Sequence, residues 1–177
     1  MKRLILMRHA KSDWSQDGLS DFERPLNKRG VKDASKMGKW MATQVDASEV
    51  PLPQLILCSS ARRTRQTRQL FLLGLQSAGV DPHGIEQRDL EEMYLASTST
   101  LVDLVHQHLN SHQSLMLIAH NPGMDGIVSH YCPAPPLSDS GKLMATANIA
   151  VIEFDDLLNP SLKILQRPRE LHLQSGE

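Results

Sequence analysis

The chain is poor in cysteine and in long apolar runs. Its two cysteines, Cys58 and Cys132, cannot build a disulfide framework, and Cys58, at the end of an apolar run, is expected to be a buried small hydrophobe. The first apolar run, Leu4 to Met7, is too short for the core of a signal peptide, and no stretch approaches the length of a membrane span. We therefore expect a reducing, cytoplasmic setting and no membrane association.

The chain also lacks a charge excess of either sign. Nineteen basic and 20 acidic residues give a net charge of -1, so bulk charge offers no case for binding nucleic acid or an anionic membrane. The length of 177 residues suits a single domain over 1–177, whose last residues, 175–177, are expected to fray. Linker-like stretches at 50–53 and 132–136 are too short to indicate a second domain.

Short apolar runs alternate with helical patterns, which predicts a three-layer α/β/α sandwich with a central, mostly parallel mixed sheet. The expected strands cover residues 4–7, 55–58, 85–90 and 115–119, followed by a closing hairpin of 147–154 and 162–166. The expected helices cover 29–46, a segment capped by Ser59 or Ser60 and running through Leu75, a segment capped by Thr98 or Ser99, and a short helix with Pro122 in its first turn.

Arg8 and His9 directly follow the first expected strand. Ligand sites of open α/β sheets lie just past the carboxyl ends of the strands. Histidine can act as nucleophile, base or ligand near neutral pH, and arginine is a fixed cation whose fork matches a phosphate. This pair predicts chemistry on an anion, most simply a phosphoryl group.

Arg63 stands out from a cluster of arginines in the second expected helix. On a helical wheel, the apolar stripe of this helix passes almost through Arg63, whereas Arg62, Arg65 and Arg68 point to its margin or to the opposite side and are expected to be solvated. A cation in a first helical turn is explained if an anion lies there too, because helix N-termini attract phosphate. The alternative is an ion pair between Arg63 and a buried carboxylate.

His120 repeats the placement of His9, because it follows the strand at 115–119 and precedes turn residues. Either histidine alone is as readily explained as a structural hydrogen-bonding group. If the two strands are neighbours, both histidines and Arg8 meet at one edge of the sheet, and Arg63 arrives from its helix.

Four blocks of the sequence resemble the histidine phosphatase superfamily, also called the phosphoglycerate-mutase-like fold. They are Leu6-Met7-Arg8-His9-Ala10, Arg24-Pro25-Leu26-Asn27-Lys28-Arg29-Gly30, Ser59-Ser60-Ala61-Arg62-Arg63-Thr64-Arg65-Gln66-Thr67 and His120-Asn121-Pro122-Gly123. Their order and spacing agree over nearly the whole chain. The length and the Arg24-Pro25-Leu26 form most resemble the short SixA-type phosphohistidine phosphatases. Ser60 and Thr64 depart from the proline and alanine usual in the family and affect only local packing.

The resemblance implies a two-step displacement in which His9 forms a phosphohistidine that water then hydrolyses. Arg8, Arg63 and a protonated His120 would bind the phosphoryl group and stabilise its charge. His9 must be neutral, so its other ring nitrogen is expected to donate to a backbone carbonyl. No metal and no cofactor is implied, because the cations are protein groups.

The resemblance also points to Glu92, with Glu91 as the next candidate, as the acid that protonates the leaving group; the alternative is a solvated loop carboxylate. An imidazole leaving group, with a pKa near 6.5, would depart with little help, whereas an alkoxide needs an acid. Lys11 and Ser12 are expected to bind substrate at the rim of the site, and Trp14 is a candidate partner contact or a half-buried loop aromatic.

The resemblance implies that larger members of the superfamily carry insertions that cover the site. Few residues separate the second and third strands here, so the site is expected to be open and shallow, which suits a phosphorylated protein side chain. His108 and His112 have a metal-compatible spacing but lack acidic or cysteine partners, so a solvated face is the preferred interpretation for them and for His106. The favoured function is removal of phosphate from phosphohistidine in a signalling or phosphotransfer protein. The alternatives are a small-molecule phosphomonoesterase and a catalytically idle phosphoprotein-binding module.

Overall fold

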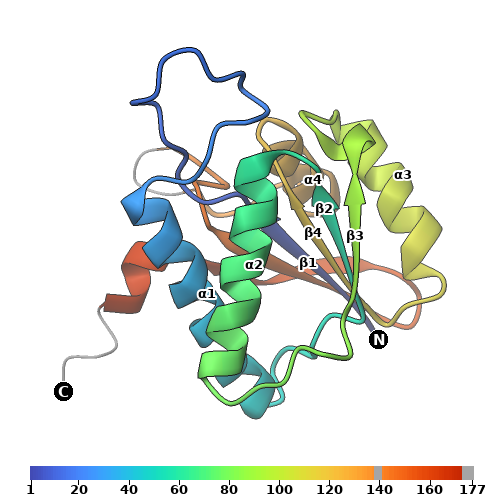
Figure 1. Cartoon of the computed structure of the whole chain (residues 1–177). Helices are drawn as coiled ribbons and strands as arrows, with labels where there is room; N and C mark the ends of the chain where they lie inside the picture. Colours follow the sequence, from blue (N-terminus) through green and yellow to red (C-terminus); the bar gives the residue numbers. More distant parts are fainter. Residues whose placement is uncertain (138–140, 173–177) are drawn as a thin grey trace.

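A computed structural model describes residues 1–137 and 141–172, so the expected fraying of residues 175–177 lies outside the described residues. Within these ranges six strands form one sheet in the order β3-β2-β4-β1-β5-β6 (Figure 1). The strands are β1 (Lys2–Arg8), β2 (Leu55–Ser59), β3 (Glu86–Leu90), β4 (Ser114–Ala119), β5 (Ile149–Phe154) and β6 (Pro160–Gln166). The first four run parallel, and the β5–β6 hairpin is antiparallel, which confirms the mixed sheet.

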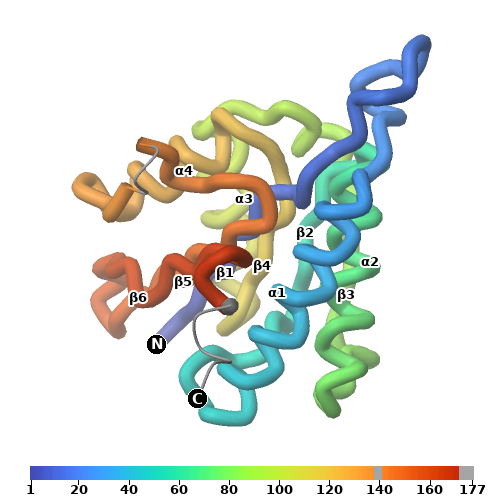
Figure 2. Tube along the Cα trace, turned by 90° about the vertical axis from the view of Figure 1, so that its left-hand side faces the viewer, coloured from blue at the N-terminus to red at the C-terminus, as the bar shows by residue number. Residues whose placement is uncertain are grey.

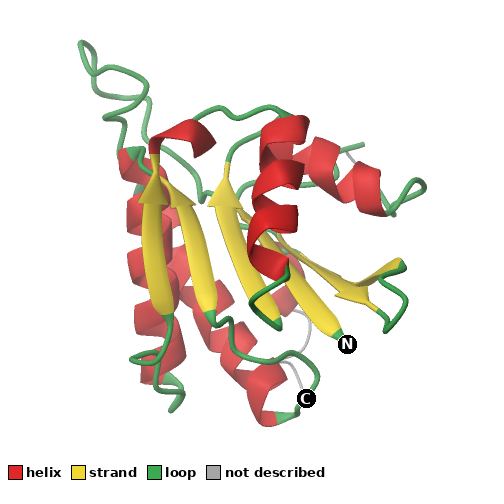
Figure 3. Cartoon of the chain, turned by 90° about the vertical axis from the view of Figure 1, so that its right-hand side faces the viewer, coloured by secondary structure: helices red, strands yellow, loops and turns green. Residues whose placement is uncertain are grey.

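Helices cover both faces of the sheet and make the three expected layers (Figure 3). The helices are α1 (Lys28–Asp46), α2 (Arg62–Ser77), α3 (Thr98–Leu109) and α4 (Gly123–Tyr131), with short 3₁₀ turns η1 (Glu91–Met93) and η2 (Pro168–His172). One core lies between the sheet and α1 and α2, and a second lies between the sheet and α3 and α4.

Strand β1 lies inside the sheet and is covered on both sides. Leu4 and Leu6 join the core under α3 and α4, while Ile5 and Met7 join the core under α1 and α2. All four side chains are fully buried. A strand buried on both faces needs apolar residues at every position, which is why this segment has a continuous apolar run instead of an alternating pattern.

Two glycines allow α1 and α2 to pack in direct backbone contact. A Cβ atom added at Gly38 would lie 2.0 Å from the carbonyl oxygen of Phe71, and one added at Gly74 would lie 2.2 Å from the carbonyl oxygen of Ser35. Any larger residue at either position would push the helices apart. This close contact fixes the position of α2, whose first turn carries Arg63.

The predicted caps of two helices are wrong by one or two residues. Ala61 is the N-cap of α2 and makes no side-chain cap bond; the hydroxyl of Ser59 contacts Nε2 of His120 at 2.8 Å and accepts from the N–H of Ala61 at 3.4 Å. Ser97 caps α3, because its Oγ accepts from the backbone N–H of Thr100 at 3.2 Å. The cap of α1 is Asn27, whose side chain accepts from the N–H of Gly30.

Cys58 is fully buried, as expected, and burial raises the pKa of its thiol to about 12. It is therefore unreactive at neutral pH. None of the helices in the two described ranges combines the length and the apolar character that crossing a membrane requires.

Candidate active site

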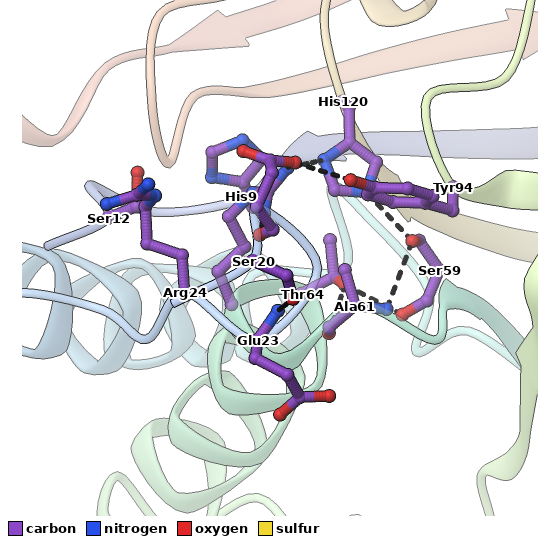
Figure 4. Close-up of polar contacts among 12 residues, drawn as sticks. His9, Ser12, Ser20, Glu23, Arg24, Ser59, Ala61, Thr64, Tyr94 and His120 are labelled. Atoms are coloured by element: carbon purple, nitrogen blue, oxygen red, sulfur yellow. Dashed lines mark hydrogen bonds and ion pairs between the residues drawn. The ribbon is translucent and has the colours of Figure 1, made fainter. Parts of the chain in front are cut away.

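Strand register places His9 beside His120. Strands β1 and β4 are parallel neighbours, with Arg8 opposite Ala119, so both chains leave the sheet at the same level. The backbone N–H of His9 donates to the carbonyl of Ala119 at 3.1 Å, and the two imidazole ring centroids lie 5.1 Å apart (Figure 4). The expectation that the two histidines meet at one edge of the sheet is confirmed.

His9 is held as a neutral imidazole in one tautomer. Its Nδ1 lies 2.7 Å from the carbonyl oxygen of Ala10, and because a carbonyl only accepts, Nδ1 carries the proton. Nε2 therefore keeps its lone pair. Burial, reinforced by the charges of Arg63 and Arg8, lowers the pKa of His9 to about 4. At neutral pH this side chain has the protonation state that a nucleophile requires.

The backbone that follows His9 is held by α2 on one side and by α1 on the other. The N–H of Ala10 donates to Oγ1 of Thr67 at 3.0 Å, and that hydroxyl donates in turn to the carbonyl of Arg63 at 2.7 Å. On the α1 side, a Cβ added at Gly30 would lie 2.2 Å from the carbonyl oxygen of Lys11. His9 therefore stands on a segment held on both sides by backbone contacts.

Arg63 projects from the first turn of α2 into this edge and is 4% exposed. Its Nη2 lies 2.9 Å from a carboxylate oxygen of Asp21 and 3.2 Å from Nδ1 of His120, and its Nη1 donates to the carbonyl of Asp21. The carboxylate alternative considered for Arg63 is thus present, but that carboxylate is 43% exposed and belongs to a loop. The Asp21 carboxylate therefore occupies the guanidinium donors of Arg63 that a phosphoryl group could use.

His120 is neutral in this structure. Arginine only donates, so Nδ1 of His120 accepts from Arg63, and Nε2 donates to the hydroxyl of Ser59 at 2.8 Å. Burial, with the nearby His9 and Arg63, lowers the pKa of His120 to about 3. His120 is therefore neutral in the free protein, because burial beside arginine disfavours a second cation; the protonated His120 expected beside a bound phosphoryl group stays a prediction.

Asp21 and Tyr94 belong to the site, although the sequence patterns do not single them out. The Tyr94 hydroxyl donates to Asp21 at 2.6 Å, and the Tyr94 ring stands edge-on to His120 with centroids 5.5 Å apart (Figure 4). Partial burial raises the pKa of Asp21, but the hydrogen bonds from Tyr94 and Arg63 outweigh it and hold this pKa below its usual range. No periodic pattern marks either residue; the position of Tyr94 just after the third strand is the one available signal.

Arg8 is the second cation of the site. Its Nη1 donates to the carbonyl of Met144 at 3.0 Å, while its buried Nε has no hydrogen-bond partner among the described residues. The charge of Arg8 lowers the pKa of both His9 and His120. Arg8 therefore adds positive potential to both imidazoles and keeps an unused donor.

The remaining predicted site residues lie outside the hydrogen-bonded cluster. Glu92 is exposed on η1, and within the described ranges no hydrogen bond or ion pair joins it to the histidines or arginines of the site. Ser12 is buried and accepts from the indole N–H of Trp14 at 3.1 Å, and Lys11 is half-buried at the edge. Trp14 is 65% exposed and stacks on Arg24, so it lies at the surface of this loop.

The other arginines and histidines lie apart from the cluster. Arg65 is exposed as expected, but Arg68 is largely covered and pairs with Asp89 at 2.7 Å, which corrects the expectation of a solvated side chain. His108 and His112 have ring centroids 6.3 Å apart on α3 and just beyond it. Over residues 1–137 and 141–172, no three side chains of the metal-binding types gather into a potential metal site.

We expect acid to destabilise this fold through the two buried histidines. Both have folded-state pKa values, about 4 and about 3, below the ordinary value of 6.5, so the unfolded chain binds more protons. The stability that the two neutral histidines contribute is fully present well above pH 6.5 and is lost as the pH falls below that value. Urea titrations between pH 7 and about 5 should show that the free energy of unfolding falls with pH. The slope of this fall should be smaller by about one proton in His9→Gln. It should be unchanged in His106→Gln, which replaces an exposed histidine. A slope equal in His9→Gln and the wild type would contradict the neutral buried state of His9.

Comparison with known proteins places this arrangement in a family. The family profile of the histidine phosphatase superfamily (branch 1) matches residues 4–101, more than half of the chain, so the protein belongs to the histidine phosphatase superfamily. The uncharacterized protein Rv1276c of Mycobacterium tuberculosis is 32% identical over 116 residues, 66% of this chain and 63% of that protein. The match thus spans less than two thirds of this relative's length.

Solved structures give the same fold over nearly the whole chain. A protein from Agrobacterium tumefaciens that carries the name phosphohistidine phosphatase SixA is 30% identical, with a TM-score of 0.75 over 94% of this chain and 98% of that one. The protein histidine phosphatase SixA complexed with tungstate is 20% identical, with a TM-score of 0.72 over 96% and 99%. An Escherichia coli protein named as an alpha-ribazole-5'-P phosphatase is 14% identical, with a TM-score of 0.65 over 95% and 98%. The phosphoglycerate-mutase-like α/β fold is confirmed, and its neighbours have different named substrates.

Proposed function

We propose that this protein is a phosphatase that uses His9 as its nucleophile and acts on phosphohistidine in a signalling or phosphotransfer protein. The observation that carries the proposal is the bond from Nδ1 of His9 to the Ala10 carbonyl, which leaves Nε2 unprotonated beside two arginines. A phosphoprotein-binding module would need the cations but not a tautomerically fixed nucleophile.

The reaction has two displacements. Nε2 of His9 bonds to phosphorus as the bond from phosphorus to the leaving group breaks, and water then attacks the phosphohistidine and releases inorganic phosphate. Arg8 and Arg63 stabilise the charge on the transferring oxygens. The arriving phosphoryl group would take the place of the Asp21 carboxylate on Arg63, since both are anions on one fork. A dianion there also favours proton uptake by His120, which is neutral before substrate binds.

Among the described residues, the one carboxyl group of the contact cluster is Asp21, and its bonds from Tyr94 and Arg63 hold its pKa below the usual range, so it supplies no proton to a leaving group at neutral pH; this favours a phosphohistidine substrate. A phosphorylated imidazole leaves as a weak base, whereas an alkyl phosphate leaves as an alkoxide that needs a proton. Glu92, exposed at the rim, is our proposed acid for esters alone. The similarity to the SixA-type protein at 30% identity supports the same substrate class.

The test compares turnover of a phosphohistidine peptide with turnover of sugar and nucleotide monophosphates. We expect kcat/KM to be at least about tenfold higher on the peptide, which needs no acid. Glu92→Gln should change the peptide rate less than about twofold, with Glu91→Gln as the matched neighbour control. Faster turnover of the small esters would replace the proposed substrate with the phosphomonoesterase alternative.

A further inference from the structure

A cationic groove runs from the active site along α1. Its volume is about 720 Å³. Its basic lining includes the site residue Arg8, Lys11, three residues of α1 (Arg29, Lys32 and Lys36), Lys142, and Arg169 on η2. Segment η2 packs against α1, although the two lie far apart in the sequence (Figure 2). Residues of both α1 and η2 therefore line the groove, whereas the exposed Arg65 of α2 lies outside it.

The charge of this groove is local and nearly uniform in sign. The lining includes one carboxylate, Asp33, which is 3.7 Å from the guanidinium of Arg29. Lys32 and Arg169 are exposed, and neither has a hydrogen bond or ion pair with another residue of the described ranges. Since the whole chain has a net charge of -1, positive potential concentrated here directs an acidic partner to one face.

The spacing of the cations indicates the shape of the ligand. Arg29, Lys32 and Lys36 lie within eight residues of helix, about 10 Å along α1. A second phosphate on a small molecule would need its donors gathered at one point. Cations spread along a helix instead match an extended row of carboxylates.

We propose that this groove binds an acidic segment of the phosphoprotein substrate, next to its phosphorylated residue. Arg8 links the groove to the active site, because it lines the groove and its charge lowers the pKa of both His9 and His120. The inference rests on the proposed phosphoprotein substrate. Attraction between exposed charges raises the association rate and weakens with salt, so the groove contributes to kcat/KM more than to kcat.

The experiment uses two histidine peptides of equal length, one with glutamates and one with glutamines on both sides of the histidine. We expect the wild type to hydrolyse the phosphorylated glutamate peptide about tenfold faster in kcat/KM, with the preference shrinking as ionic strength rises to about 0.3 M. The variant Lys32→Glu/Arg169→Glu should lose this preference and keep its rate on the glutamine peptide. Lys39→Glu/Arg65→Glu, which changes net charge equally outside the groove, should retain the preference.

Binding of the fluorescently labelled, unphosphorylated glutamate peptide, followed by anisotropy, tests the groove without catalysis. If the wild type binds this peptide and Lys32→Glu/Arg169→Glu does not, the groove is supported as a docking site. If in addition neither phosphopeptide is hydrolysed, the proposed function fails while the docking site stands. Equal rates on both peptides, or an equal loss in the control variant, would overturn the groove as a docking site.

Discussion

His9→Ala is expected to lower kcat/KM by about 10⁴-fold, because it removes the atom that forms the covalent intermediate. The side chain is buried, and its ring donates to the Ala10 carbonyl, so the substitution leaves the hydrogen bonds of His120 and Arg63 in place. Initial rates on a phosphohistidine peptide measure the loss. His106→Ala, at an exposed histidine on α3, should retain the wild-type rate.

Trapping of the intermediate distinguishes a nucleophile from a residue that only positions substrate. Rapid quenching of the wild type during turnover should leave one phosphoryl group per chain on Nε2 of His9, and none in His9→Ala. Phosphate found on His120 instead would reverse the roles of the two histidines. A loss smaller than about 100-fold would show that water can attack directly without the covalent step.

Arg63→Ala is expected to lower kcat/KM by about 10³-fold, the scale at which a buried arginine stabilises a transferring phosphoryl group. The substitution removes both donors that contact Asp21 and the donor to His120. Asp21 is 43% exposed and keeps its bond from Tyr94, so water can solvate it and the fold should survive. Circular dichroism checks the fold, and steady-state rates on the phosphohistidine peptide measure the loss.

Two companion variants test the geometry of this contact. Arg65→Ala removes an exposed cation two positions along the same helix and should change the rate less than about twofold. Arg63→Lys keeps the charge but cannot contact two acceptors with one planar fork, so it should recover only a small part of the rate. Full activity in Arg63→Lys would mean that Arg63 acts as a simple point charge.

The strands and helices are largely predictable from local pattern. Continuous apolar runs mark the strands that are buried on both faces, and helical spacing alone places Arg63 on the inner side of its helix, where the fold has it. The errors occur at helix ends. A serine near an expected start predicts a cap, but the shorter bond of the Ser59 hydroxyl, at 2.8 Å, is to His120, a partner that local sequence does not reveal.

The site itself is predictable in part. Residues at strand ends and on a periodic helix can be placed, because the geometry of those elements is regular. Asp21 and Tyr94 come from a long loop and from a turn, where position depends on packing against distant segments. The neutral state of His120 in the free protein is not predictable from local sequence for a related reason, since its pKa depends on burial and on Arg63, which lies 57 positions away.

The sequence by itself determined the layered α/β order and placed Arg8, His9 and His120 at strand ends and Arg63 on the inner side of its helix, because these follow from local periodicity. The tertiary structure made β1 and β4 neighbours, which brought these groups to one edge of the sheet. Only the tertiary structure decided how these groups are charged and paired. It places an internal carboxylate on Arg63 and a neutral His120 against Ser59, and it brings η2 beside α1 to form the cationic groove. Burial and long-range contacts set these properties, because electrostatic interactions depend on distance in space and not along the chain.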